Sequence, residues 1–109
     1  MSLLAITPPP PYYAVIFTSE RTEGDQGYGS MSDHMVELAS QQTGFLGFES
    51  ARGADGLGIT VSYWSTLEDI KAWKEQSNHQ SAQAKGKSDW YSQYAVRISK
   101  VEKDYFFEV

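Results

Sequence analysis

Cysteine is absent from the 109-residue chain, and histidine occurs only twice, as His34 and His79. The lack of cysteine excludes disulfides, thiolate nucleophiles, iron–sulfur clusters and cysteine-ligated zinc. Two histidines cannot build a site of several imidazoles within one chain, so we expect no metal. Apolar runs stay well short of the roughly 20 residues that span a bilayer, and the first residues lack the basic start of a signal peptide. We therefore expect a cytoplasmic protein without a membrane partner.

Positive charge is also scarce. The formal net charge is −5, which lacks the basic footprint of a nucleic-acid binder, so no nucleic acid is expected as a partner. The glycine-rich segment 52–58 is not a dinucleotide-binding fingerprint, because the residues after it predict a strand rather than a helix. Asp55-Gly56 between apolar runs is instead typical of a hairpin turn.

Proline is confined to one place, positions 8–11. Four consecutive prolines form a stiff extended segment that cannot donate to a sheet ladder. We interpret residues 1–11 as an N-terminal arm and residues 12–109 as a single domain. The arm could be a ligand for an SH3-like groove, although a spacer that leads into the first strand is the favoured interpretation.

The first half of the domain predicts a strand and a helix. Residues 12–18 are rich in β-branched and aromatic side chains and predict a strand, after which a polar loop begins at Ser19. Apolar residues recur at helical spacing over 28–42 and predict an amphipathic helix. Ser30 and Ser32 are the expected N-cap residues.

The second half predicts a hairpin, a further helical region and a last strand. Ser65 or Thr66 is the expected helix cap, with acidic residues in the first turn. The elements expected here are strands 45–52 and 57–64, a helix from Leu67, a short helix over 79–88 and a strand over 92–101 that could continue through 105–107.

The predicted order is β-α-β-β-α-β, an α+β fold with an antiparallel sheet of the ferredoxin-like type. Residues 12–17 are apolar without alternation, so both faces of this sheet are expected to be covered. Two helices cover only one face. We therefore expect a second copy on the other face, in a two-fold homodimer.

Aromatic residues are the most informative feature of the sequence, because the tryptophans are clustered. All three tryptophans, Trp64, Trp73 and Trp90, fall with His79 between positions 64 and 90. Tryptophan is bulky and amphipathic, and its concentration in one segment is typical of a pocket wall or an interface. This segment is where the sequence predicts a functional site.

Several motifs carry a family resemblance that covers about residues 12–105. The motifs are Gly44–Arg52, Ile59–Trp64, Ile70–Lys74, His79, Ala82-Gln83 and Trp90-Tyr91. With them the chain resembles the antibiotic biosynthesis monooxygenase (ABM) superfamily. The resemblance implies a dimeric α/β barrel with a pocket between the helices and the sheet of each subunit. Some members oxidise polyphenols or anthrones to quinones with molecular oxygen and no cofactor, which implies a small aromatic substrate.

The resemblance suggests roles for individual residues. His79 is the expected base, because the ordinary pKa of histidine, about 6.5, lies near neutral pH. Arg52 and Tyr63 are expected to hold or polarise a phenolate oxygen. Each has a structural alternative, since Arg52 could pair with an acidic neighbour and His79 could cap a helix. The residues expected to bind a planar substrate are Trp64, Trp73, Trp90, Tyr91 and Met35.

Other functions remain open from the sequence. Haem-degrading members of the superfamily use an asparagine on the first strand, a helix tryptophan and a later histidine. Trp73 matches the tryptophan, but residues 12–18 contain no asparagine and Gln83 occupies the place of the histidine. The further alternatives are a binding or sensing module for a planar molecule and a purely structural dimer, in which Trp73 extends the apolar stripe of its helix.

Overall fold

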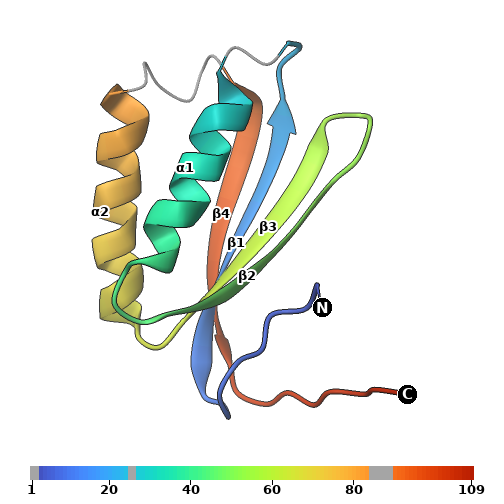
Figure 1. Ribbon diagram of the computed structural model, residues 1–109, viewed down its shortest axis with the longest axis vertical. Coiled ribbons are helices and arrows are strands. Elements are labelled where there is room, and N and C mark those ends of the chain that lie inside the picture. Colours follow the sequence, from blue (N-terminus) through green and yellow to red (C-terminus); the bar gives the residue numbers. More distant parts are fainter. Residues whose placement is uncertain (1–2, 25–26, 84–89) are drawn as a thin grey trace.

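The computed structural model describes residues 3–24, 27–83 and 90–109, apart from the side chains of 79–83. A four-stranded antiparallel sheet carries two helices on one side, while both termini lie on the other (Figure 1). The elements are β1 (Tyr12–Arg21), α1 (Tyr28–Ser40), β2 (Phe45–Arg52), β3 (Leu57–Trp64), α2 (Leu67–Gln83) and β4 (Tyr91–Val101).

The strand order is β2-β3-β1-β4, so the first and third strands occupy the middle of the sheet. β1 pairs antiparallel with β3 on one side and with β4 on the other. This is the predicted ferredoxin-like α+β fold. The hairpin strands β2 and β3 begin and end at the predicted residues, because the glycine-bearing turn between them fixes the register.

β1 extends further than its sequence predicts. Ser19, Glu20 and Arg21 belong to the strand rather than to a loop, and the amide of Arg21 donates to the carbonyl of Gly56 at 3.1 Å. The strand prediction was wrong here because backbone pairing with two neighbours outweighs the low β propensity of polar side chains. The predicted last strand is confirmed and begins one residue earlier, at Tyr91.

The structure corrects one prediction about the ends of each helix. The N-cap of α1 is Gly27 in a left-handed conformation with φ of 84°, without a side-chain cap, so the predicted capping by Ser30 and Ser32 was wrong. Thr66 does cap α2, since its hydroxyl accepts the amide of Asp69 at 3.1 Å. The separate helix predicted from residue 79 was also wrong, because α2 continues through Gln83 without a break. Residues 84–88 of that prediction lie outside the described residues.

The two faces of the sheet are distinguished by β3. We call the side that carries Trp64 the helix face, because Trp73 of α2 stacks on Trp64 with ring centroids 5.9 Å apart. We call the side that carries Tyr63 the open face. Since side chains alternate along a strand, Ile59 also lies on the open face and Thr60 on the helix face.

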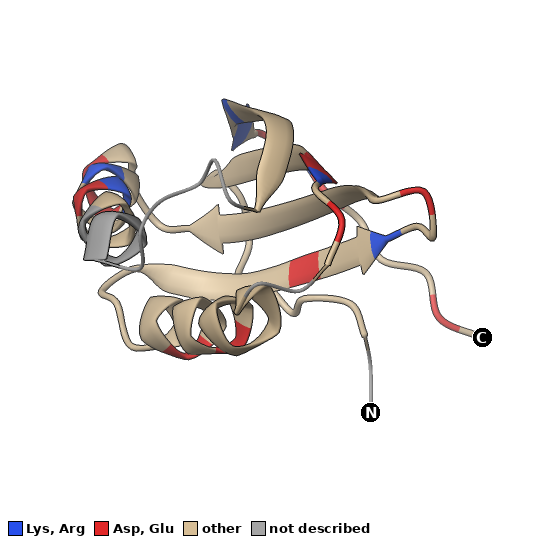
Figure 2. Cartoon of the chain, turned by 90° about the horizontal axis from the view of Figure 1, so that it is seen from above, with Lys and Arg blue, Asp and Glu red and all other residues tan. Residues whose placement is uncertain are grey.

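Few apolar side chains are fully buried within one chain. Neither helix of the described residues has the length and apolar character needed to cross a membrane. Figure 2 shows the charged residues of the two helices: in α1 these are Asp and Glu without Lys or Arg, whereas α2 carries charges of both signs. Among the described residues, the buried apolar side chains are Tyr12, Ala14, Ala39, Trp64, Ile70 and Trp90.

Candidate functional site

A cluster of two tyrosines and two arginines lies on the helix face, at the end of the sheet where β1 ends and β4 begins. The guanidinium carbon of Arg21 lies 3.6 Å from the centre of the Tyr28 ring, and that of Arg52 lies 5.8 Å from it. The hydroxyls of Tyr28 and Tyr91 are hydrogen-bonded to each other. We call these four residues the tyrosine–arginine cluster.

Arg52 is held in the cluster by the protein itself. Its guanidinium donates to the hydroxyl of Ser19 at 2.7 Å and to the hydroxyl of Tyr28 at 3.5 Å. It also donates to the carbonyls of Ser19 and Gly56. Ser19 is only 2% exposed, so the charge of Arg52 is fixed at the base of the cluster. The geometry thus gives Arg52 a positioning role toward Tyr28.

Burial keeps Tyr91 in its protonated form. Desolvation raises the pKa of its hydroxyl well above the ordinary 10.0, and the hydrogen bond with Tyr28 raises it further. The charges of Arg52 and Arg21 oppose this shift but are smaller influences. Near neutral pH, Tyr91 is therefore a hydrogen-bond donor beside two fixed positive charges. Such a group is suited to stabilising an oxyanion.

An exposed apolar strip on β4 leads away from the cluster. Tyr94, Val96 and Ile98 pair with residues of the helix face of β1, and each exposes between 42% and 51% of its surface. The rings of Phe17, Tyr91 and Tyr94 contact one another, with Phe17 at centroid distances of 5.4 Å from Tyr91 and 5.3 Å from Tyr94. The strip and the cluster together form an aromatic and aliphatic surface that ends in phenolic hydroxyls.

The three tryptophans do not share one location. Trp64 and Trp73 stack at one end of the sheet, near the start of α2, with Phe45 edge-on to Trp64. Trp90 contacts Tyr28 at the other end. Six residues of β3 at about 3.3 Å each separate the two ends by roughly 20 Å. Trp64 and Trp90 are also buried, so in this arrangement they are packing residues.

Tyr63 faces away from Arg52. It lies on the open face, where its hydroxyl donates to Glu49 at 2.6 Å and its ring contacts Tyr12 edge-on. The two side chains predicted to share a phenolate oxygen therefore do not meet within one chain. The physical reason is strand alternation, because Arg52 pairs with Gly58 on the helix face.

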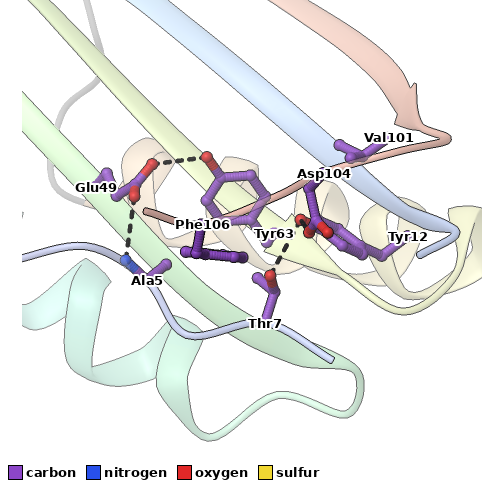
Figure 3. A pocket seen from close by; sticks show the side chains of 8 residues that line it. All are labelled: Ala5, Thr7, Tyr12, Glu49, Tyr63, Val101, Asp104 and Phe106. Carbon is purple, nitrogen blue, oxygen red and sulfur yellow. Dashed lines mark hydrogen bonds between the residues drawn. The ribbon is translucent and has the colours of Figure 1, made fainter. Parts of the chain in front are cut away.

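A cavity of about 230 Å³ opens beside Tyr63 (Figure 3). Its floor comes from the open face, and its rim comes from both ends of the chain. Each end is held by a hydrogen bond, with the Ala5 amide donating to Glu49 at 3.0 Å and Tyr12 donating to Asp104. The lining residues are Ala5, Thr7, Tyr12, Glu49, Tyr63, Val101, Asp104 and Phe106.

The remaining predicted residues are less informative. The backbone of His79 belongs to α2, but its side chain lies outside the described residues, so its role as base stays a prediction. Met35 is half-buried in α1. Among the side chains that the structure describes, no group of three His, Asp or Glu residues could hold a metal ion.

Sequence reasoning missed Tyr28 and Arg21 as site residues. Tyr28 begins a helix and was assigned to its apolar stripe, and Arg21 was placed in a loop. Their contact joins β1 to α1 across the segment between them, and pairing of this kind follows from the fold rather than from local spacing. The β propensity of residues 12–18 located the strand, but it gave no signal that the strand continues through Arg21.

Comparison with known proteins gives the same fold and a family. The uncharacterized protein YqjZ of Bacillus subtilis is 53% identical over 108 residues, which covers 99% of this chain and 95% of that protein. The crystal structure of a mutant of SnoaB, a cofactor-independent oxygenase from Streptomyces nogalater, superposes with a TM-score of 0.69 at 8% identity, covering 85% of this chain and 95% of that one. PA3566 from Pseudomonas aeruginosa gives a TM-score of 0.64 at 12% identity, with 88% and 97% covered.

The family profile described as antibiotic biosynthesis monooxygenase matches residues 11–85, which include β1, both helices up to Gln83 and the β2–β3 hairpin. The match spans well over half of the chain and agrees with the strand order and the resemblance of the sequence motifs. The chain belongs to the antibiotic biosynthesis monooxygenase family.

Proposed function

We propose that the protein is a cofactor-independent monooxygenase that oxidises a small aromatic molecule of the quinol or anthrone type. The observation that carries this proposal is the pair of hydrogen-bonded phenols, Tyr28 and Tyr91, between two arginines at the end of the apolar strip. Family membership supports it, and SnoaB, with the same fold, is described as a cofactor-independent oxygenase.

The cluster supplies what an oxygenase without a cofactor needs from its protein. A planar substrate would lie against Tyr94, Val96 and Ile98, with its phenolic oxygen directed to Tyr91. Tyr91, which is protonated near neutral pH, would then turn its one proton from Tyr28 to that oxygen and donate a hydrogen bond. The nearby guanidinium groups stabilise the negative charge that develops on the oxygen.

The reaction balances without an external reductant. For an anthrone, a base removes one proton from the ring methylene, and the resulting anion donates electrons to oxygen. One oxygen atom bonds to the ring carbon, the second leaves as water, and the methylene becomes a carbonyl. The substrate is the only reductant. His79, which the sequence predicts as the base, remains our proposal for this proton transfer.

The functional unit that we propose is a homodimer. Leu57 and Ile59 expose 44% and 46% of their surface on the open face, and few apolar side chains are fully buried within one chain. A second copy packed on the open face would remove this apolar surface from water and complete a dimeric α/β barrel. The cytoplasmic location stays a prediction of the sequence.

Oxygen uptake with an anthrone tests the proposed activity. We expect Tyr91→Phe to lower kcat about a hundredfold, which is typical of the loss of one oxyanion donor. Tyr13→Phe is the matched control, because Tyr13 loses the same atom but lies at the start of β1, at the opposite end of the strand from the cluster. No turnover of any anthrone or quinol by the parent protein would contradict the proposal, as would full activity of Tyr91→Phe.

A binding or sensing module for a planar molecule is the second candidate. It is favoured by the hydrogen bonds of Arg52, because they are made to the protein itself. Such bonds suit a residue that shapes a binding surface rather than one that holds a reacting oxygen. A thermal-shift screen with anthrones, quinols and haemin distinguishes the candidates. Binding at a hundredfold excess over Kd adds about 2.7 kcal/mol of stability. A shift without oxygen uptake indicates a binding module, and a shift with haemin alone indicates a haem protein.

A further inference from the structure

Both ends of the chain extend beyond the range that the family profile matches, and both are fixed to the open face. The N-terminal arm, residues 3–11, is held where the Ala5 amide meets Glu49. The C-terminal tail, residues 102–109, is held where Tyr12 donates to Asp104. The hydroxyl of Thr7 also donates to that of Tyr12 at 3.0 Å, which links the arm to the tail.

The sheet is shaped to receive the arm. Gly47 has a φ of 150° at an irregularity in the β2–β3 pairing, and a methyl group added there would meet the side chain of Ala5 at 3.0 Å. The close approach of Ala5 therefore depends on glycine at position 47. The arm and tail are thus ordered parts of the fold, and their conformational entropy is already lost before any partner binds.

The fixed ends nevertheless leave large apolar side chains in water. At about 150 Å² for each such side chain, the exposed portion is on the order of 700 Å². A stable interface takes about 800 Å² from each partner. The side chains, each 57% to 90% exposed, are Leu3, Leu4, Ile6, Tyr105, Phe106 and Phe107.

The position of these side chains points to the occupant. The arm and tail that carry them are fixed near the start of β1, where Ala5 approaches Gly47 and Tyr12 donates to Asp104. Leu57 and Ile59 are exposed at the opposite end of the open face, beside the β2–β3 turn. A two-fold axis that crosses the strands places each end of one sheet against the other end of its partner. In such an interface, residue i meets residue j and j meets i. Under such an axis, the apolar side chains of the arm and tail of one copy would meet the Leu57–Ile59 end of the other.

We propose that the arm and tail of each copy clasp a second copy of this chain, packing on Leu57 and Ile59 of the partner subunit. The inference rests on the homodimer of the proposed function and adds the contacts that hold it. Because the partner closes over the rim between arm and tail, the cavity beside Tyr63 becomes enclosed only in the dimer.

Sedimentation of the full chain gives the first test. We expect Phe106→Ser combined with Phe107→Ser to raise the dimer dissociation constant at least about tenfold, as for central apolar anchors. The variant should keep its circular dichroism spectrum, since both rings are exposed in one chain. Leu67→Ser is the control, because Leu67 is an apolar residue, 50% exposed, on α2 at the helix side. Equal dissociation constants for the double variant and the control would overturn the clasp.

Disulfide trapping gives the second test, since the chain contains no cysteine of its own. A chain with Phe107→Cys is mixed with a chain with Ile59→Cys under oxidising conditions, and Leu67→Cys replaces Ile59→Cys in the control mixture. We expect at least about tenfold more mixed disulfide than in the control. A dimer in sedimentation without this excess overturns the clasp and leaves the homodimer standing. A monomer overturns both, while oxygen uptake tests the activity separately.

Discussion

The helix face and the open face use alternate residues of the same strands, yet they hold their side chains by different interactions. On the helix face, buried rings and one buried hydroxyl carry the structure, with Trp64 stacked on Trp73 and Ser19 beneath Arg52. On the open face, tyrosine–carboxylate hydrogen bonds join the sheet to the ends of the chain. One face therefore supplies stability within a chain, and the other is the face on which we propose that a partner packs.

The largest expected effect is on the helix face. Trp64→Ala removes a ring that is fully buried between Phe45 and Trp73, and it should lower the free energy of unfolding by about 3–5 kcal/mol. Urea unfolding of the dilute protein measures this change. A loss below about 1 kcal/mol would show that the helix face does not carry the core.

A smaller loss is expected from one buried hydroxyl. Ser19→Ala leaves a donor of Arg52 without its acceptor and should cost about 1–3 kcal/mol. Oxygen uptake should fall as well, because Arg52 positions Tyr28. Ser50→Ala is the control, since the Ser50 hydroxyl contacts Thr60 at an exposed position on the same face. Equal stability losses in the two variants would argue against a special role for Ser19.

The open face should make stability depend on pH in the alkaline range. Burial and the hydrogen bond to Glu49 raise the pKa of Tyr63 above the ordinary 10.0, and burial likewise raises the pKa of Tyr12. The unfolded chain therefore loses these protons first, so the contribution of the two tyrosines to stability is constant below about pH 10 and falls above it. Urea unfolding at several pH values should show a shallower fall for Tyr63→Phe. An unchanged slope would mean that Tyr63 titrates normally in the fold.

The smallest expected effect within one chain belongs to Ile59. Its side chain is half exposed on the open face, so Ile59→Ala should cost about 1 kcal/mol in dilute protein. The cost should grow at concentrations where the dimer forms, because dimerisation buries the side chain. Unfolding curves at two protein concentrations measure this difference. A concentration-independent loss would remove Ile59 from the interface.

Local patterns predicted the fold well because each element carries its own signal. The Asp55-Gly56 turn fixed the hairpin, and Thr66 capped α2 as expected. The separate helix predicted from residue 79 was wrong, because an exposed helix surface tolerates polar residues such as Gln76–Asn78 without interruption.

The site was less predictable because it depends on contacts between distant residues. Alternation along β3 places Tyr63 and Trp64 on opposite faces, but the sequence does not say which face the helices cover. The stacking of Arg21 on Tyr28 and the hydrogen bond between Tyr28 and Tyr91 join three separate elements. Nothing in the spacing of these residues predicts that they meet.

One side chain connects the tip of the hairpin to the phenols. Arg52 binds the carbonyl of Gly56 in the turn and the hydroxyl of Tyr28 at the same time. A displacement of the turn is therefore transmitted to Tyr28 through a single rigid guanidinium group. Turn residues 53–56 are thus coupled through Arg52 to the position of Tyr28, which none of them contacts through a hydrogen bond described above.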